Sequence, residues 1–304
     1  MALMIKKGDR QMLTAQKLLP RGYYLFYDDK YLVTVSSHTK IYDRTNLKKE
    51  ILSVKTQYAY WGMFLSDEEI LIKSTDGHYW FIDIVKQTSR RIFPVPRKQY
   101  GAEARPVVDP GQGFLFDFTN DDCVSVLQKI DFDGTSRELY RLPVYGSSNL
   151  FRTSESVLVI TNNRGMNEIT TENRHELRRI EFNVQTGKVD HEERCELPIP
   201  SIYEDLDFAI LWDGSIIRYN GEQLNVLNSE GLAKPLGAVH PQRFETNILC
   251  LMPGDRVRFY NLQNPSTYKE VMVPYPDYVV HYEDKLLFCT WEGVYQILYK
   301  EVFP

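Results

Sequence analysis

The stretch Ser74–Arg91, STDGHYWFIDIVKQTSRR, decides how the rest of the chain is interpreted. Its first half gathers a serine, an aspartate, a histidine and a tryptophan, as a catalytic motif would. Its second half is an apolar run that reaches Asp83, followed by a short polar turn and a polar strand. The alternatives are therefore an active site and one copy of a repeated β-hairpin.

The second half of this stretch recurs along the chain. Comparable segments read KIYDRTNLKKEIL, QKIDFDGTSRELYRL, RRIEFNVQTGKVDHEERCEL, LNVLNSEGLAKPL and RFYNLQNPSTYKEVMV. Each has an apolar run that ends at an Asp or Asn anchor, and the anchors are Asp43, Asp83, Asp131, Asn183, Asn228 and Asn261. Asp and Asn bond to the backbone two residues on and tolerate the left-handed conformation of tight turns. The anchors lie 33 to 52 residues apart, a spacing typical of four-stranded propeller blades.

Proline marks the connection from one repeat to the next. The connectors include LLPRGYY, IFPVPRKQY, YRLPVYG, ELPIPSIY and VMVPYPDY, and proline cannot continue a sheet ladder. Two short alternating stretches lie between connector and hairpin, which predicts two further strands in each repeat. STDGHYWF is then the turn between the second and third strands of the second repeat. It is similar to the Asp-box of sialidases but is one residue short, lies on another turn and occurs once, so we interpret it as structural.

The six anchored hairpins predict six blades, and the C-terminal segment DYVVHYEDKLLFCTWEGVYQILYKEVFP supplies three strands of a seventh. The N-terminal segment RQMLTAQKLLP precedes the first connector and supplies the missing outer strand. Such pairing would remove two exposed sheet edges. We therefore predict an all-β, seven-bladed β-propeller of four-stranded antiparallel blades, forming a single domain over residues 1–304 and closed by the N-terminal strand pairing with the last blade.

Over essentially its whole length the chain resembles the seven-bladed β-propeller superfamily, with its WD40-like, YVTN and quinoprotein-like repeats. The turn that carries the resemblance most fully is Phe182–Gly187, FNVQTG. The Gly-His and Trp-Asp signature of true WD40 repeats is absent, since Trp212-Asp213 falls elsewhere in its repeat.

Composition narrows the classes of partner. The formal charge of −5 over 304 residues, without a basic run, argues against nucleic-acid or anionic-membrane binding. No segment approaches the roughly 18 apolar residues of a membrane helix. The four cysteines, Cys123, Cys195, Cys250 and Cys289, have no metal-binding spacing. Buried, reduced thiols in a soluble, cytoplasmic protein are expected.

The connectors carry many aromatic and arginine side chains, which suit a recognition surface. The candidate binding residues are Tyr23, Tyr24, Tyr58, Tyr60, Trp61, Tyr100, Arg105, Tyr145, Arg152, Tyr203, Arg243, Tyr275 and Tyr278. The alternative for each ring is packing between blades. On the connector face, these side chains indicate a non-catalytic scaffold that binds a protein or peptide partner. A carbohydrate is the other possible class of ligand.

A second candidate site is the long turn 162–175 of the fourth repeat, NNRGMNEITTENRH. Its candidate residues are Arg164, Asn167, Glu168, Glu172 and Arg174. Long loops of this kind are either functional or disordered, and both readings stay open.

Signals for catalysis are few. His38, His78, His175 and His240 fall on turns or connectors and are interpreted as solvated side chains. Nucleophile, metallopeptidase and phosphate-loop motifs are missing, so no catalytic residue, metal or cofactor is predicted. The alternative function is a metal-dependent hydrolase or lyase of lactonase type, with Asn149, Glu204, Glu245 and Asp277 eligible by position.

Overall fold

The computed structural model describes residues 13–57, 59–93, 99–101, 105–121, 124–142, 147–164, 174–198, 207–210, 216–219, 224–227, 242–245, 248–252, 254–261 and 264–304. Its contacts divide the chain into two compact units. One unit, here the terminal unit, joins Met1–Gly22 to Ala238–Pro304, and the other, the central unit, is Tyr23–Gly237. The fold is all-β apart from one short helix.

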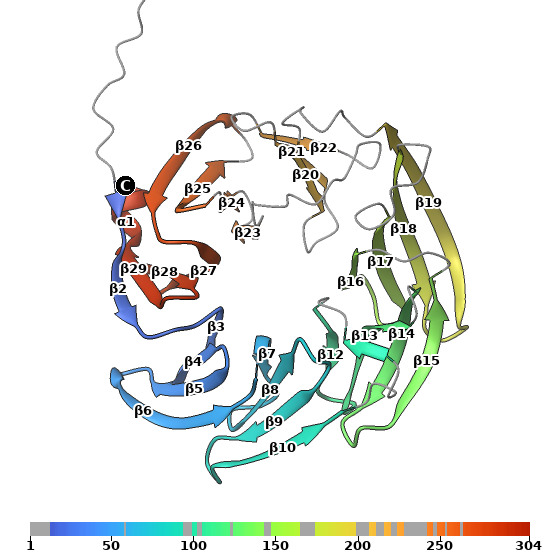
Figure 1. The fold of residues 1–304 in the computed structure, drawn as a ribbon, viewed down its shortest axis with the longest axis horizontal. Helices are drawn as coiled ribbons and strands as arrows, with labels where there is room; N and C mark the ends of the chain where they lie inside the picture. Colours follow the sequence, from blue (N-terminus) through green and yellow to red (C-terminus); the bar gives the residue numbers. More distant parts are fainter. Residues whose placement is uncertain are drawn as a thin grey trace, which may run out of the picture. The chain divides into compact units, whose positions relative to one another are not determined.

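The central unit begins with two four-stranded antiparallel sheets, each with its strands in chain order. The first consists of β3 (Tyr24–Tyr27), β4 (Tyr31–Val35), β5 (His38–Asp43) and β6 (Asn46–Lys55). The second consists of β7 (Ala59–Phe64), β8 (Glu69–Ser74), β9 (Tyr79–Asp83) and β10 (Thr88–Ile92). STDGHYWF therefore spans the turn between β8 and β9, as predicted (Figure 1).

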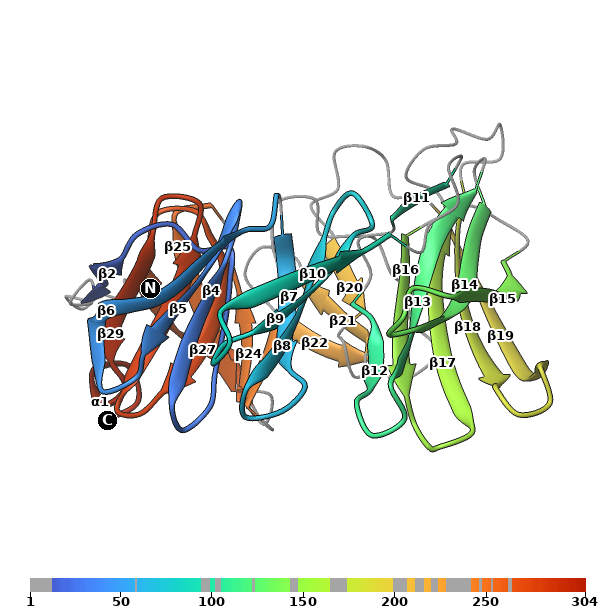
Figure 2. The ribbon, with the colours of Figure 1, turned by 90° about the horizontal axis from the view of Figure 1, so that it is seen from below.

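The third sheet has a divided inner strand. Strands β11 (Gln99–Gly101) and β12 (Val107–Asp109) both pair with β13 (Phe114–Asp121), followed by β14 (Val124–Asp131) and β15 (Ser136–Arg141). The fourth sheet is β16 (Ser147–Arg152), β17 (Val157–Arg164), β18 (Arg174–Asn183) and β19 (Lys188–Pro198), with long strands side by side (Figure 2). Strands β20 (Asp207–Ile210), β21 (Ile216–Tyr219) and β22 (Leu224–Leu227) pair in order.

The terminal unit contains two sheets. One holds β23 (Gln242–Glu245), β24 (Ile248–Leu251), β25 (Arg256–Asn261) and β26 (Asn264–Met272), with β1 (Leu13–Thr14) parallel to β26. The other holds β27 (Pro276–Tyr282), β28 (Lys285–Thr290), β29 (Val294–Leu298) and β2 (Gln16–Leu19). Helix α1 (Tyr299–Val302) follows β29.

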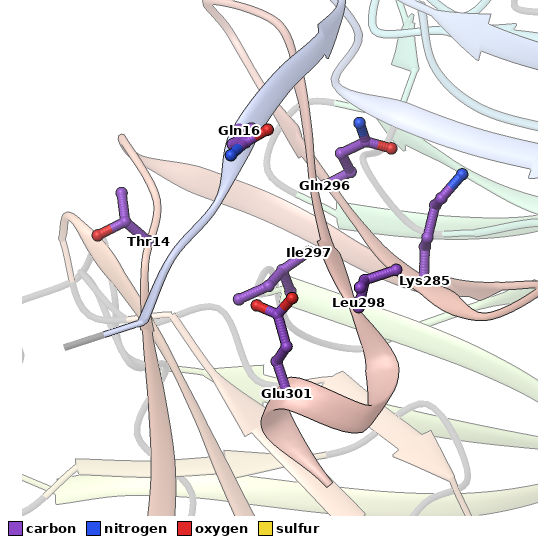
Figure 3. A pocket seen from close by; sticks show the side chains of 7 residues that line it. All are labelled: Thr14, Gln16, Lys285, Gln296, Ile297, Leu298 and Glu301. Carbon is purple, nitrogen blue, oxygen red and sulfur yellow. The ribbon is translucent and has the colours of Figure 1, made fainter. Parts of the chain in front are cut away.

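The N-terminal strand therefore belongs to the last sheet. β2 pairs antiparallel with β29, with Gln16 opposite Gln296 and Leu19 opposite Val294. The parallel pairing of β1 with β26 was not predicted, and through it one N-terminal segment pairs with a strand of both sheets (Figure 3). Ring closure and the number of seven blades remain predictions.

The described hairpin anchors end the third strand of their sheets, and Asp43, Asp83 and Asn183 make the expected turn bonds. The Asp43 carboxylate accepts hydrogen bonds from the backbone N–H and hydroxyl of Thr45, at 3.0 and 2.6 Å. The Asp83 carboxylate accepts a hydrogen bond from the backbone N–H of Lys86 at 2.8 Å. The side-chain oxygen of Asn183 accepts hydrogen bonds from the backbone N–H groups of Gln185 and Thr186 at 3.0 and 3.1 Å. Asn228 lies outside the described residues. The local bonding that motivated the repeat is therefore present.

One predicted boundary needs correction. The turn expected over 162–175 is shorter, since Asn162, Asn163 and Arg164 belong to β17 and Arg174 and His175 to β18. The ladder continues to the pair Arg164 and Glu176. The sequence alone indicated a turn here because asparagine, glycine and threonine are typical of turns.

In the central unit, the core lies in the seams between consecutive sheets. Ile70, Ile72 and Ile82 pack toward the first sheet, whereas Leu71 and Phe81 pack with Leu115 and Ile130 of the third. This split follows from the alternation of side chains along a strand. Gly62 permits the first seam to close, since a Cβ there would lie 2.5 Å from Ile72 Cδ1 and 2.8 Å from Phe26 Cε1.

Candidate recognition site

The predicted binding residues that the structure describes are divided between the two units. Those within strands are Tyr24, Tyr60, Trp61, Tyr100, Arg152, Arg243 and Tyr278, and those between strands are Tyr23, Arg105 and Tyr275. Tyr58, Tyr145, Tyr203, Asn167, Glu168, Glu172, Glu204 and His240 lie outside the described residues. The structure therefore describes only part of the predicted face.

Several predicted aromatics pack into the core of the central unit. Trp61 is 7% exposed and belongs to the seam between the second and third sheets, where Tyr24 and Tyr60 pack partly buried against it. The Arg105 guanidinium lies 5.5 Å from the Tyr24 ring centroid. The packing alternative thus describes these rings.

Arg152 connects two strands of the central unit. Its guanidinium lies 2.9 Å from the Asp109 carboxylate of β12 and donates to the carbonyl oxygens of Ser154 and Glu155, both at 3.2 Å. These contacts fix β16 beside β12.

Tyr275, in the terminal unit, is exposed, in contrast to the buried aromatic side chains of the central unit. Its side chain is 61% exposed, and its backbone has φ of 44° between Pro274 and Pro276. A bulky residue rarely adopts this left-handed conformation, and strained backbone of this kind clusters at functional sites. Tyr275 therefore presents its ring to solvent although this conformation is unfavourable for its backbone.

Trp291 lies beside Tyr275 at the same end of the sheet and is 49% exposed. Pro276 pairs with Thr290, so Tyr275 and Trp291 occupy the next positions beyond this last pair. The sequence reasoning missed Trp291. The available signal was a large aromatic inside a glycine-bearing turn, Thr290-Trp-Glu-Gly293, between two alternating strands. We refer to Tyr275 and Trp291 as the aromatic pair.

The turn that carries Trp291 is held firmly. The Thr290 hydroxyl accepts the backbone N–H groups of Glu292 and Gly293, both at 3.0 Å, and the Thr290 N–H donates to the Gly293 carbonyl at 2.9 Å. The ammonium group of Lys17, on β2, donates a hydrogen bond to the Glu292 carbonyl oxygen at 2.8 Å. A Cβ at Gly293 would lie 2.8 Å from the Leu19 carbonyl oxygen. The N-terminal strand therefore helps to position the turn that carries Trp291.

A buried ionic cluster lies in the seam between the second and third sheets of the central unit. Lys73 of β8 is 2.6 Å from the Asp117 carboxylate of β13, and their side chains are 0% and 3% exposed. The Tyr79 hydroxyl also donates to Asp117. Burial, with the neighbouring Asp117 charge, raises the pKa of Tyr79 well above its ordinary value, so the phenol stays protonated.

Burial also raises the pKa of Asp117, while Lys73 acts in the opposite direction. A substrate cannot reach groups so deeply buried unless the two sheets separate. The cluster therefore contributes to the packing of the sheets rather than to a surface site.

The histidines and metal candidates do not converge within the described residues. His38 begins β5, and His78 lies in the turn after β8, where its Nδ1 is 2.9 Å from the Asp76 carboxylate. His175, Asn149, Glu245 and Asp277 lie in four different strands. In the part of the chain that the structure describes, no three His, Cys, Asp or Glu side chains are arranged to hold a metal ion.

Other predictions were tested in part. Cys250 and Cys289 are buried free thiols, and burial raises the pKa of Cys289 far above its ordinary value. No helix in the described residues has the length and apolar character to cross a membrane. Comparison with known proteins finds no family model and no curated sequence that matches the chain.

Proposed function

We propose that this protein is a non-catalytic binding module that recognises an extended peptide segment of a protein partner at the aromatic pair. The observation that carries this proposal is the exposure of Trp291 beside Tyr275, whose backbone is held at φ of 44°. Exposed tyrosine and tryptophan supply large apolar area with a polar tip, and both residue types dominate the energetics of protein interfaces.

The placement of the two rings favours a peptide over other ligands. Tyr275 and Trp291 lie beyond the last pair of β27 and β28, at neighbouring backbone positions. Aromatic rings so placed suit contact with the side chains of an extended segment.

The finer architecture is part of the same proposal. The repeated four-stranded antiparallel sheets in chain order and the pairing of β2 with β29 support a seven-bladed β-propeller closed through its last blade. In such a fold the aromatic pair lies on the face formed by the connectors and the turns between second and third strands.

A peptide-display selection tests the proposal. The intact chain is used as bait, and the selected peptides are measured against the wild type and the double variant Tyr275→Ala with Trp291→Ala. Interface aromatics of this type typically contribute about 2 kcal/mol or more, so we expect a loss of about thirtyfold or more in affinity. The melting temperature should stay unchanged because both rings are exposed.

The matched control is Val85→Ala, which truncates another exposed apolar side chain, 58% exposed, in the β9–β10 turn of the central unit. It should bind as the wild type does. Equal affinity of the wild type and the double variant would reject the aromatic pair as the site. Enrichment on a glycan array in place of peptides would reassign the ligand class.

A further inference from the structure

The contact between Lys73 and Asp117 holds an amine and a carboxyl group together inside the central unit. Their side chains are 0% and 3% exposed, and the Lys73 Nζ atom lies 2.6 Å from Asp117 Oδ2. Because Oδ2 is bonded to Cγ at roughly 1.2 Å, the nitrogen is no more than about 3.8 Å from the carboxyl carbon. Reacting atoms in a near-attack arrangement are about 3–3.5 Å apart. A small shift of either side chain therefore brings the amine to the carboxyl carbon.

This site compensates an ion pair poorly. The Lys73 ammonium and the Tyr79 hydroxyl both contact the same oxygen of Asp117, Oδ2. The other oxygen, Oδ1, is buried and has no hydrogen-bond partner. Two buried charges are offset well only when hydrogen bonds also satisfy the remaining lone pairs. An amide made from the same two groups carries no charge, so its formation removes the cost of keeping both ions out of water.

The surroundings favour the uncharged forms that react. Burial raises the pKa of Asp117, although Lys73 acts in the opposite direction. Burial also favours the neutral form of a lysine amine, and the neutral amine is the nucleophilic form. Transfer of a proton across the contact from Lys73 to Asp117 gives a neutral amine beside a carboxylic acid.

We propose that Lys73 and Asp117 condense in the folded protein to an amide that cross-links β8 and β13. The Nζ atom bonds to Cγ of Asp117, and the bond between Cγ and Oδ2 breaks. Two of the three ammonium protons leave with Oδ2 as one water, and the third stays on the amide nitrogen. Atoms and charges balance without a further reactant. The Tyr79 hydroxyl, which donates to Oδ2, assists the departure of that oxygen.

The reaction depends on the folded state. Lys73 and Asp117 belong to different sheets, and they meet only because these sheets pack together. Leu71, Leu115 and Ile130 are fully buried in the same seam, which keeps water from the reacting groups. The ion pair is the starting state, and the amide accumulates while the protein stays folded. The cross-link is separate from the aromatic pair and independent of the peptide recognition proposed above.

Mass spectrometry of the intact full chain tests the proposal. The purified protein is incubated in its folded state and sampled over time, beside a portion kept unfolded in urea. We expect a species lighter by one water whose share grows in the folded portion alone. A tryptic digest should then contain a branched product that joins the peptides of Lys73 and Asp117, because cleavage after Lys73 is lost. The cross-linked fraction should also unfold at higher urea concentration, since the amide closes a long loop in the unfolded chain.

The branched peptide distinguishes this reaction from another loss of water. The chain contains three Asp-Gly sequences, Asp76-Gly77, Asp133-Gly134 and Asp213-Gly214. An aspartate before glycine can lose one water by closing a succinimide ring on its own backbone. That product stays a linear peptide and does not require Lys73.

Lys73→Met should abolish the branched peptide. The matched control is Lys86→Met, which removes an ammonium 2.8 Å from Asp83 in an exposed pair and should cross-link as the wild type does. Tyr79→Phe keeps the ring and should slow accumulation at least about tenfold, since it removes the proton donor at the leaving oxygen; an unchanged rate would overturn the role of Tyr79. The cross-link is overturned if the folded wild type yields no branched peptide, or if Lys73→Met loses water to the same extent as the wild type.

Discussion

Replacing Lys73 by methionine should destabilise the central unit far more than an ordinary lysine substitution. Methionine keeps most of the side-chain length but removes the ammonium that lies 2.6 Å from Asp117. The Asp117 carboxylate, whose side chain is 3% exposed, then keeps the Tyr79 hydroxyl as a donor but loses the positive charge beside it. Removing one partner of a buried ion pair typically costs about 3–5 kcal/mol of unfolding free energy, because the other charge stays desolvated.

The matched control is Lys86→Met in the same sheet. Lys86 also pairs with an aspartate, Asp83, at 2.8 Å, but its side chain is 76% exposed. Exposed pairs of this geometry contribute little, so this variant should resemble the wild type. The two substitutions change the same atoms and differ in burial.

The effect should depend on pH in a defined direction. Burial raises the pKa of Asp117 in the folded protein, and loss of Lys73 removes the influence that lowers it. The folded variant therefore holds this proton more tightly than the unfolded chain, whose Asp pKa is about 3.9. The Lys73→Met variant therefore loses stability as the pH rises above about 3.9 and through the pKa of Asp117 in the folded protein. Its loss of unfolding free energy relative to the wild type should be larger at about pH 8 than at about pH 5.

Urea unfolding at both pH values measures the effect, and the thermal equivalent is a fall in melting temperature of about 6–20 °C. The double variant Lys73→Met with Asp117→Leu should recover much of the loss, since an apolar replacement of a buried pair is often tolerated. If Lys73→Met unfolds at the same urea concentration as Lys86→Met at about pH 8, the buried pair does not exist as described.

Three further outcomes are expected. Deleting Met1–Leu19 removes β1 and β2, which exposes two strand edges. We expect aggregation, seen by size-exclusion chromatography, or a large fall in melting temperature. A monomeric product of unchanged stability would contradict this. Gly62→Ala should cost about 1–3 kcal/mol through overpacking against Ile72 and Phe26, while Gly111→Ala, where a Cβ meets Asp109 only at 3.8 Å, should be neutral in urea unfolding. Millimolar calcium, zinc or magnesium should leave the melting temperature unchanged, and an increase that Asp277→Ala abolishes would instead favour the hydrolase alternative.

Features governed by local bonding were predictable from the sequence. Asp43, Asp83 and Asn183 bond to backbone groups two or three residues away, so each hairpin carries its own signature wherever it lies in the fold. The assignment of STDGHYWF to a turn followed from the same repeat. The strand that completes the last sheet was also predictable, because counting strands per repeat left one missing at the C-terminus and one spare at the N-terminus.

Features that depend on which surfaces meet were decided only by the tertiary structure. Lys73 has the sequence context of an ordinary polar position in an alternating strand, and it is buried because Asp117 of another sheet faces it. Trp61 within β7 and Trp291 just after β28 are the same residue type, yet one packs in a seam and the other faces solvent. The parallel pairing of β1 with β26 brings together residues from both ends of the chain. Local propensity carries no information about such contacts, because their free energy comes from packing and desolvation against partners distant in the sequence.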